Sequence, residues 1–215
     1  MIALLESLRV DGTSHDAPLR FPVQLVARHA GHQANDFRGY MGRIEAGKVQ
    51  RGDILMVQPS GRTACVEDIV TFDGSLASAV VGQSVTLVLD RDLDISRGDM
   101  LATAARPATL LTNLTADLCW LSEEPLDLNR KYSLKHTTRH VFARVTHINA
   151  LLDINTQLKR PADSLKLNDI AEVAINVQQP LAVDAYDIIR ATGAFILIDE
   201  LTKQTVAAGM IRLNS

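Results

Sequence analysis

The stretch Gly42–Asp53, which reads GRIEAGKVQRGD, does most to decide the fold of this chain. Gly47 and Gly52 divide it into two short alternating segments, and glycine can adopt the positive φ that tight turns require. The same punctuation returns in the stretch RGDML at Arg97–Leu101. We therefore predict a structural turn motif between antiparallel strands, formed by Gly42, Gly47, Gly52, Asp53, Gly98 and Asp99.

Alternation of apolar and polar residues with a period of two extends through most of the chain, as expected for half-buried strands. Five sets of residues are each predicted to share one strand face: Phe21, Val23, Leu25 and Ala27; Val85, Leu87 and Leu89; Leu114, Ala116, Leu118 and Trp120; Val141, Ala143 and Val145; Ala171, Val173, Ile175 and Val177. Turn formers separate short strands at spacings near ten residues, which favours antiparallel barrels or sandwiches. We expect an all-β chain with two consecutive antiparallel β-barrels.

The boundary between the barrels is expected at Thr103–Thr109, which reads TAARPAT and interrupts the alternation. Pro107 cannot continue a central strand. The first barrel is therefore predicted to span residues 18–105, and the second residues 108–213. Helical spacing occurs only at Ile2–Leu8, and the segment after it is polar. We expect residues 1–17 to be a linker and the stub of a helix from a preceding domain.

The composition is typical of a soluble, cytoplasmic globular protein. Hydrophobic residues make up 47% of the 215 residues and charged residues 22%, which is an ordinary balance. No apolar run approaches the ~18 residues that span a bilayer. The net charge of −3 argues against a nucleic-acid partner, because phosphate-binding surfaces are usually basic. Cys65 and Cys119 lack C-x-x-C spacing and lie among apolar residues, so we expect buried, reduced thiols.

No motif in the 215 residues carries recognisable chemistry. The sequence contains neither a G-x-x-x-x-G-K-[ST] phosphate loop nor an Asn-Lys-x-Asp motif, so no nucleotide is expected to be held as in P-loop GTPases. His136, His140 and His147 could be metal ligands, but no further ligand completes a tetrahedral site, and we favour hairpin or surface histidines. The acidic run Asp90–Asp94 lacks the Gly and Glu of a calcium loop. We predict no catalytic, cofactor-binding or metal-binding residue.

Positive charge gathers near the turns of the first barrel, at Arg38, Arg43, Lys48 and Arg51. Three interpretations are open: a solvated strand face, which we favour, a contact for an acidic protein partner, and an RNA contact. Trp120 continues the apolar face of its strand, so core packing is favoured over an interface role. The four basic residues are retained as a candidate partner-contact patch.

Several stretches resemble the translation-type GTPases. Gly42–Asp53, the strand GQSVTL at Gly82–Leu87 and the closing RGDML resemble the second domain of elongation factor Tu and its relatives. The tail RATGAFILID at Arg190–Asp199, with TVAAGMI at Thr205–Ile211, resembles the third domain of one branch. That branch is the GTPase (large) subunit of bacterial ATP sulfurylase, also called sulfate adenylyltransferase.

Three further stretches agree with the same branch: FPVQ at Phe21–Gln24, IVTFDG at Ile69–Gly74 and LKLNDIAEV at Leu165–Val173. The resemblance implies that the full subunit hydrolyses GTP and supports formation of adenosine 5′-phosphosulfate from ATP and sulfate by a catalytic subunit. Its GTP and Mg²⁺ would lie in an N-terminal GTPase domain whose motifs these residues lack. We therefore expect no cofactor here and no catalysis by the chain alone.

The resemblance implies two partners, the catalytic subunit of ATP sulfurylase and the parent's own N-terminal GTPase domain. The alternative is a tRNA- or RNA-binding β-barrel module of a translation-factor-type GTPase. Such a module would need a basic face with aromatic side chains, whereas aromatic residues make up only 4% of this chain. A free-standing β-barrel enzyme is disfavoured, because no nucleophile or metal constellation is recognisable.

Overall fold

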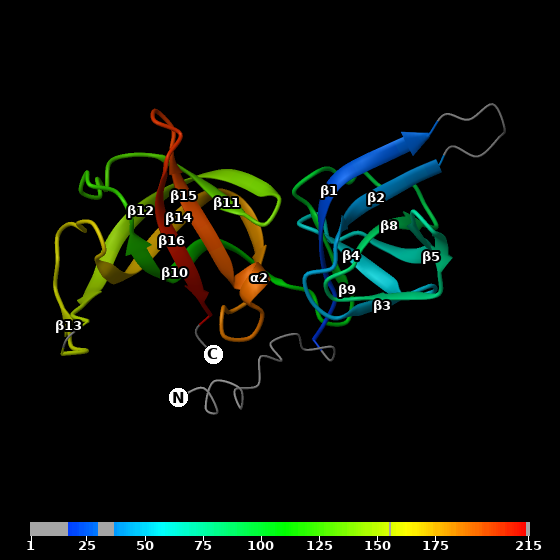
Figure 1. Ribbon diagram of the computed structural model, residues 1–215, viewed down its shortest axis with the longest axis horizontal. Helices are drawn as coiled ribbons and strands as arrows, with labels where there is room; N and C mark the ends of the chain where they lie inside the picture. Colours follow the sequence, from blue (N-terminus) through cyan, green and yellow to red (C-terminus); the bar gives the residue numbers. More distant parts are fainter. Residues whose placement is uncertain (1–16, 30–36, 155, 214–215) are drawn as a thin grey trace.

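The structure, a computed structural model, describes residues 17–29, 37–154 and 156–213. In this part of the chain nearly all regular structure is β, in two large sheets that follow one another along the sequence. The predicted helical stub at Ile2–Leu8 and most of the predicted linker lie outside the described residues. The expected fold class, two consecutive antiparallel β-barrels, is confirmed (Figure 1).

The first barrel contains β1 (Arg20–His29), β2 (Phe37–Arg43), β4 (Ile54–Gln58), β5 (Thr63–Thr71), β8 (Ser84–Leu89) and β9 (Met100–Thr103). Their order is β4-β9-β1-β2-β8-β5, and β4 also pairs with β5, so the sheet closes on itself. Strand β6 (Gly74–Leu76) extends β5, and β3 (Lys48–Gln50) pairs with β7 (Ser78–Val80) in a small separate sheet. Closure leaves the six strands of the ring without a free edge.

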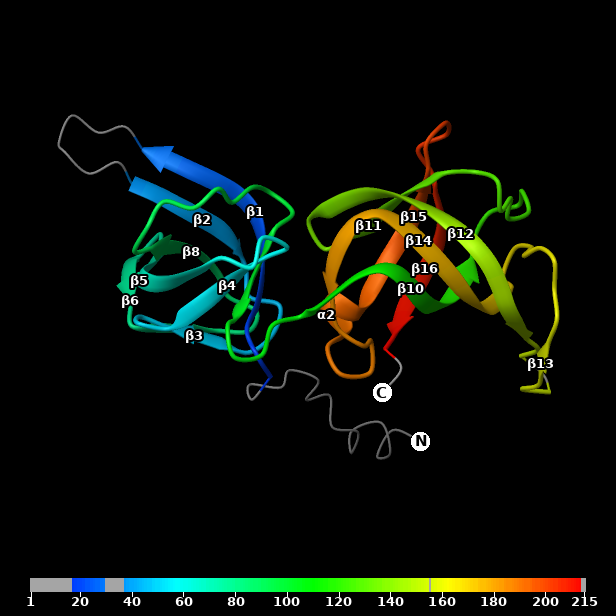
Figure 2. The same ribbon diagram turned by 180° about the vertical axis from the view of Figure 1, so that it is seen from behind.

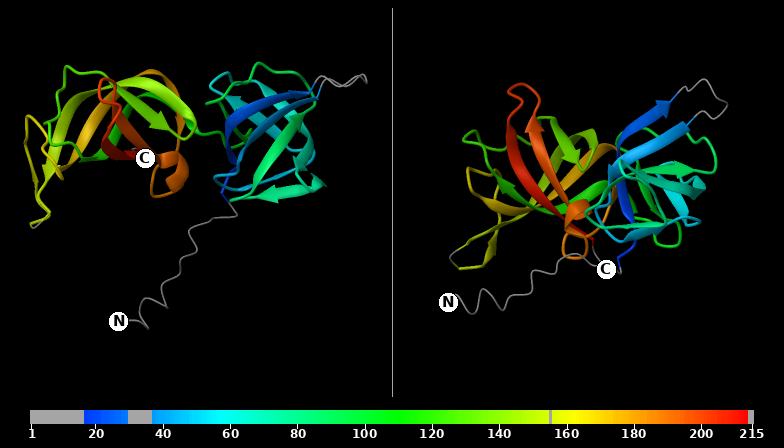
Figure 3. Two further views of the ribbon diagram at one scale, coloured as in Figure 1. Left: turned by 45° about the horizontal axis from the view of Figure 1, so that its top comes forward. Right: turned by 45° about the vertical axis from the view of Figure 1, so that its right-hand side comes forward.

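The second barrel contains β10 (Thr109–Trp120), β11 (Tyr132–His136), β12 (Arg139–Leu152), β14 (Ile170–Val183), β15 (Ala194–Asp199) and β16 (Thr205–Arg212). The order is β11-β15-β16-β10-β14-β12, and pairing of β11 with β12 closes the ring. Strand β13 (Lys159–Arg160) extends β12, and the short helix α2 (Arg190–Gly193) precedes β15. Residues 104–108 connect the barrels, which lie side by side in Figure 2 and in the left view of Figure 3.

Each barrel has its own apolar core, filled by the inward-facing residues that alternate along its strands. Four of the five predicted strand faces are confirmed as buried, namely those of β8, β10, β12 and β14. Trp120 lies in the second core at 1% exposure, with its ring edge-on to that of Tyr132 at 5.9 Å. The prediction of core packing for Trp120 is therefore confirmed.

The predicted face of β1 is wrong beyond Val23. The pairing of β1 with β2 shifts register between Val23 and Leu25, and such a bulge reverses which side chains point inward. Leu25 is consequently 58% exposed, while Val26 packs against the first core. Period-two alternation cannot detect a bulge, because the sequence on either side of it still alternates.

Three glycines of the predicted turn motif adopt positive φ: Gly47 at 72°, Gly52 at 90° and Gly98 at 96°. Gly42, in contrast, lies within strand β2. A Cβ atom at Gly42 would lie 2.5 Å from the carbonyl oxygen of Pro22, so close packing of β1 on β2 explains this glycine better than a turn. Its assignment to a turn is corrected accordingly.

The two thiols are free, as predicted, but they are half-buried and not buried. Cys65 and Cys119 are strand residues whose side chains do not point into the cores, since neither belongs to a core cluster. In the part of the chain that the structure describes, no helix has the length and hydrophobicity needed to cross a membrane.

Candidate functional site

Three of the four residues in the predicted basic patch form ion pairs within the first barrel. Arg38 forms an ion pair with Asp92 and lies over the Tyr40 ring, 5.6 Å from its centroid. Arg43 contacts Glu45 at 3.3 Å, and Arg51 contacts Asp68 at 2.6 Å. These carboxylates neutralise much of the charge that the sequence presents.

Lys48 is exposed and, unlike the three arginines, forms no ion pair among the described residues. It borders a cleft of about 520 Å³ together with Gln50, Asp53 and Arg106. Arg38 and Arg43 lie near opposite ends of β2, roughly 16 Å apart along an extended strand. The role of these four residues as a partner contact stays a prediction.

The three histidines lie in different environments. His136 is buried at 2% exposure, whereas His140 and His147 are exposed. His136 pairs with Arg139 across the β11–β12 turn, in which Thr137 has a φ of 49°. Among the described residues, no group of three or more His, Cys, Asp or Glu side chains is arranged to hold a metal ion.

The contacts that set one barrel against the other form a polar junction. Arg20, the first residue of β1, is 2% exposed and reaches Asp184, which follows β14 in the second barrel. Its Nε and Nη2 atoms each donate to one Asp184 carboxylate oxygen at 2.8 Å. Such a bidentate, charge-assisted pair fixes direction as well as distance.

The Arg20–Asp184 pair continues into the second barrel through Thr192 in α2. The Thr192 hydroxyl donates to Asp184 at 2.6 Å, and the Thr192 carbonyl accepts a hydrogen bond from Nε2 of His136 at 2.8 Å. Burial lowers the pKa of His136 below its ordinary value. The bond to Thr192 and the charge of Asp184 act in the opposite direction, so burial is what favours the neutral imidazole.

A second ion pair, with the charges of the two barrels reversed, joins the barrels at the turn Arg97–Asp99. Asp99, from the predicted turn motif, accepts from Nη1 of Arg139 at 3.1 Å, and Arg139 also donates to Gln179 at 3.0 Å. Gly98 packs directly against Arg139, because an added Cβ atom would lie 3.3 Å from the Arg139 Cα. In one pair the first barrel supplies the cation, and in the other it supplies the anion.

The connecting segment is held between these two ion pairs. The side-chain amide of Gln58, which is 3% exposed, donates to the Ala108 carbonyl at 2.8 Å and accepts from the Ala108 N–H at 3.0 Å. Around it lies a small apolar cluster of Met100, Ala102, Ala108 and Ala182. The junction thus combines buried polar pairs with very little apolar packing.

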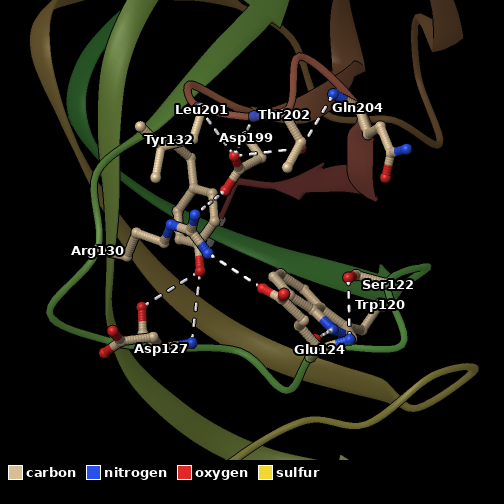
Figure 4. Close-up of polar contacts among 10 residues, drawn as sticks. All are labelled: Trp120, Ser122, Glu124, Asp127, Arg130, Tyr132, Asp199, Leu201, Thr202 and Gln204. Carbon is tan, nitrogen blue, oxygen red and sulfur yellow. Dashed lines mark hydrogen bonds and ion pairs between the residues drawn. The ribbon is translucent and has the colours of Figure 1, made fainter.

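The end of the second barrel near Trp120 carries another polar cluster (Figure 4). Arg130 lies between the carboxylates of Asp199 at 2.9 Å and Glu124 at 3.4 Å. Asp199 also accepts hydrogen bonds from the backbone N–H groups of Thr202 at 2.8 Å and Leu201 at 2.9 Å. These bonds, that of Thr202 first, hold the pKa of Asp199 below its usual range. The cluster fixes the β15–β16 hairpin and performs no evident chemistry.

Sequence reasoning singled out Asp99 but missed Arg20, Asp184 and Thr192. The available signal was a charged residue directly next to buried strand residues, Arg20 before Phe21 and Asp184 after Val183. A partner 164 positions away cannot be identified from that signal alone. In the described residues, the arrangement joins the two barrels through side-chain ion pairs.

Comparison with known proteins gives consistent results. Residues 113–212 match the GTP-eEF1A C-terminal domain-like family. Sulfate adenylyltransferase subunit 1 of Tolumonas auensis is 41% identical over 211 residues, which are 98% of this chain and 44% of that protein. The subunit 1 of Laribacter hongkongensis is 43% identical over 213 residues, 99% of this chain and 44% of that protein. The chain thus spans less than half the length of these curated relatives.

Solved structures show the same fold in more distant proteins. Sup35 complexed with GDP superposes with a TM-score of 0.82 at 20% identity, covering 100% of this chain and 52% of that one. Sup35 complexed with GMPPNP gives a TM-score of 0.80 at 20% identity, with 98% and 50% covered. At this identity the likeness shows the shared two-barrel fold alone.

Proposed function

The chain is homologous over nearly its whole length to part of sulfate adenylyltransferase subunit 1, and we propose that it docks the catalytic subunit of such an enzyme. In this role it relays the state of a GTPase domain to the catalytic subunit and takes no part in the reaction itself. The homology carries the proposal, because a protein named subunit 1 works together with another subunit.

The geometry supports a scaffold more than a reactive site. A closed barrel has no free strand edges within its ring, so it can transmit a rigid-body rotation with little internal yielding. The junction supports the same role, since Arg20 and Asp99 tie the first barrel to the second in two directions. A nucleotide-driven displacement at one barrel would therefore move the other as well.

The whole enzyme's activity is part of the proposal. The catalytic subunit would form adenosine 5′-phosphosulfate from ATP and sulfate, and GTP with Mg²⁺ would bind in a GTPase domain of the parent subunit. The free thiols of Cys65 and Cys119 support a reducing, cytoplasmic setting. The chain alone would neither hydrolyse GTP nor form the sulfate ester.

Isothermal titration calorimetry of this chain with the cognate catalytic subunit tests the docking role. We expect a saturable complex of defined stoichiometry. Charge reversal by Lys48→Glu should weaken it if the basic patch faces an acidic partner, whereas Lys131→Glu, at an exposed lysine of the second barrel, serves as the matched control. Absence of any complex would contradict docking, and steeply salt-dependent binding of tRNA would favour the RNA-binding alternative.

A further inference from the structure

We propose that Arg20 is a latch that sets the relative orientation of the two barrels, and that its loss frees them to rotate while each stays folded. The inference goes beyond docking, because it assigns the stiffness between the barrels to one buried side chain. It also stands apart from docking, because it can be tested without any partner protein.

One guanidinium group connects three parts of the chain, two through backbone carbonyls and one through a carboxylate. Nη1 of Arg20 donates to the carbonyl of Leu19 at 2.9 Å and to the carbonyl of Arg106 at 3.0 Å, while Nε and Nη2 bind Asp184. The entry to the first barrel, the connecting segment and the second barrel therefore meet at this side chain. Displacement of any one of them must stretch bonds to the other two.

Burial makes the latch depend on both charged partners. The Arg20 side chain is 3% exposed and that of Asp184 13% exposed, so neither charge is well hydrated. When one member of a buried pair is removed, the other is left without compensation, which favours opening of the site to water. Since Asp184 lies at the junction and outside both cores, water can reach it if the barrels move apart.

The remaining contacts at the junction are too few to hold the orientation alone. The shared apolar cluster consists of Met100 and three alanines, whereas each barrel buries many large side chains in its own core. Because the cores are separate, each barrel keeps its internal packing when the junction opens. The Asp99–Arg139 pair, at 18% exposure for both side chains, is the weaker of the two ion pairs.

Pulsed electron–electron double resonance on the full 215-residue chain tests the latch. Spin labels would be attached at Glu67→Cys in β5 and Arg144→Cys in β12, both exposed, with Cys65 and Cys119 replaced by serine. The labelled chain without any further substitution is expected to give one narrow distance distribution. Arg20→Met and Asp184→Asn should each broaden it by about twofold or split it, as for two bodies released from a shared contact.

The matched control is Arg51→Met, which breaks the exposed Arg51–Asp68 pair within the first barrel and should leave the distribution unchanged. Arg20→Lys should restore part of the narrow distribution, since it keeps the charge but loses the bidentate geometry. Trp120 fluorescence reports whether the second barrel remains folded, and circular dichroism reports on both barrels. Narrow distributions in both Arg20→Met and Asp184→Asn would overturn the proposal, and so would unfolding of a barrel in both variants.

Discussion

The Phe195 ring lies against the backbone of Gly209, its cross-strand partner between β15 and β16. A Cβ atom added at Gly209 would lie 2.1 Å from Cζ of Phe195, far inside van der Waals contact. Phe195 is itself 4% exposed and belongs to the second core. The glycine therefore makes room for an aromatic ring in a closed barrel.

Gly209→Ala should destabilise the chain by about 1–3 kcal/mol, because the ring must leave its rotamer or push β16 outward. Urea unfolding followed by Trp120 fluorescence measures the change. The neighbouring Ala208→Ser, at an exposed position, should change stability by no more than about 0.5 kcal/mol. A double variant that also carries Phe195→Leu should recover part of the loss, and strict additivity would show that the two residues do not interact.

Alanine substitutions at two glycines with nearly equal positive φ can distinguish the cost of backbone strain from the cost of steric crowding. Gly47 has a φ of 72° and Gly61 a φ of 75°, but only at Gly47 would a Cβ atom meet a neighbour, the Ala17 carbonyl oxygen at 2.4 Å. Gly61→Ala should cost about 1–2 kcal/mol, the usual penalty of a left-handed alanine. Gly47→Ala should cost clearly more. Equal losses in thermal or urea unfolding would disprove the crowding at Ala17.

The predictability of the fold differs sharply from that of the junction. Alternation located the inward faces of β8, β10, β12 and β14, because each is a regular strand with one side on a core. It failed at Leu25, where a bulge reverses the strand face without changing the pattern. Glycine punctuation marked the turns at Gly47 and Gly52, but it could not show that Gly42 serves close strand packing.

The junction was beyond prediction for a physical reason. Arg20 and Asp184 belong to different barrels, and their contact depends on how two closed sheets pack. Neither residue lies in a local motif, and a charge at the end of a strand is usually solvated. The basic patch shows the converse limit, since the sequence singled out Arg38 and Arg51 as candidate contact residues but could not reveal their carboxylate partners.

Stability should fall as the pH is lowered through the range in which unfolded histidine becomes charged. Burial depresses the pKa of His136 in the folded chain below its ordinary value of 6.5. Between these two values the unfolded state binds more protons than the native state, so the free energy of unfolding decreases as the pH falls. His136→Gln keeps a donor for the Thr192 carbonyl but does not titrate.

Urea unfolding of the parent and of His136→Gln across pH 5–8 measures this dependence, and the variant should show a smaller loss of stability toward acid. The exposed His147→Gln is the control and should follow the parent. Parallel curves for the parent and His136→Gln would refute a neutral, buried His136.

Asp199→Asn should destabilise the β15–β16 hairpin by about 1–3 kcal/mol, because a buried acceptor of charge-assisted bonds is replaced by an amide. The amide cannot pair with Arg130 and also accept from Leu201 and Thr202. Hydrogen exchange of the Leu201 and Thr202 amides should accelerate more than that of the β10 amides. Unchanged exchange at both amides would show that the carboxylate does not hold the turn.

Competition in the assembled enzyme tests the docking claim most directly. This chain would be added in increasing excess to an active sulfate adenylyltransferase containing its cognate catalytic and GTPase subunits, and GTP-dependent formation of adenosine 5′-phosphosulfate would be measured. Because the chain would occupy the docking site without a GTPase domain, we predict saturable inhibition that an excess of catalytic subunit reverses. Full activity at a saturating excess of the chain would contradict the account.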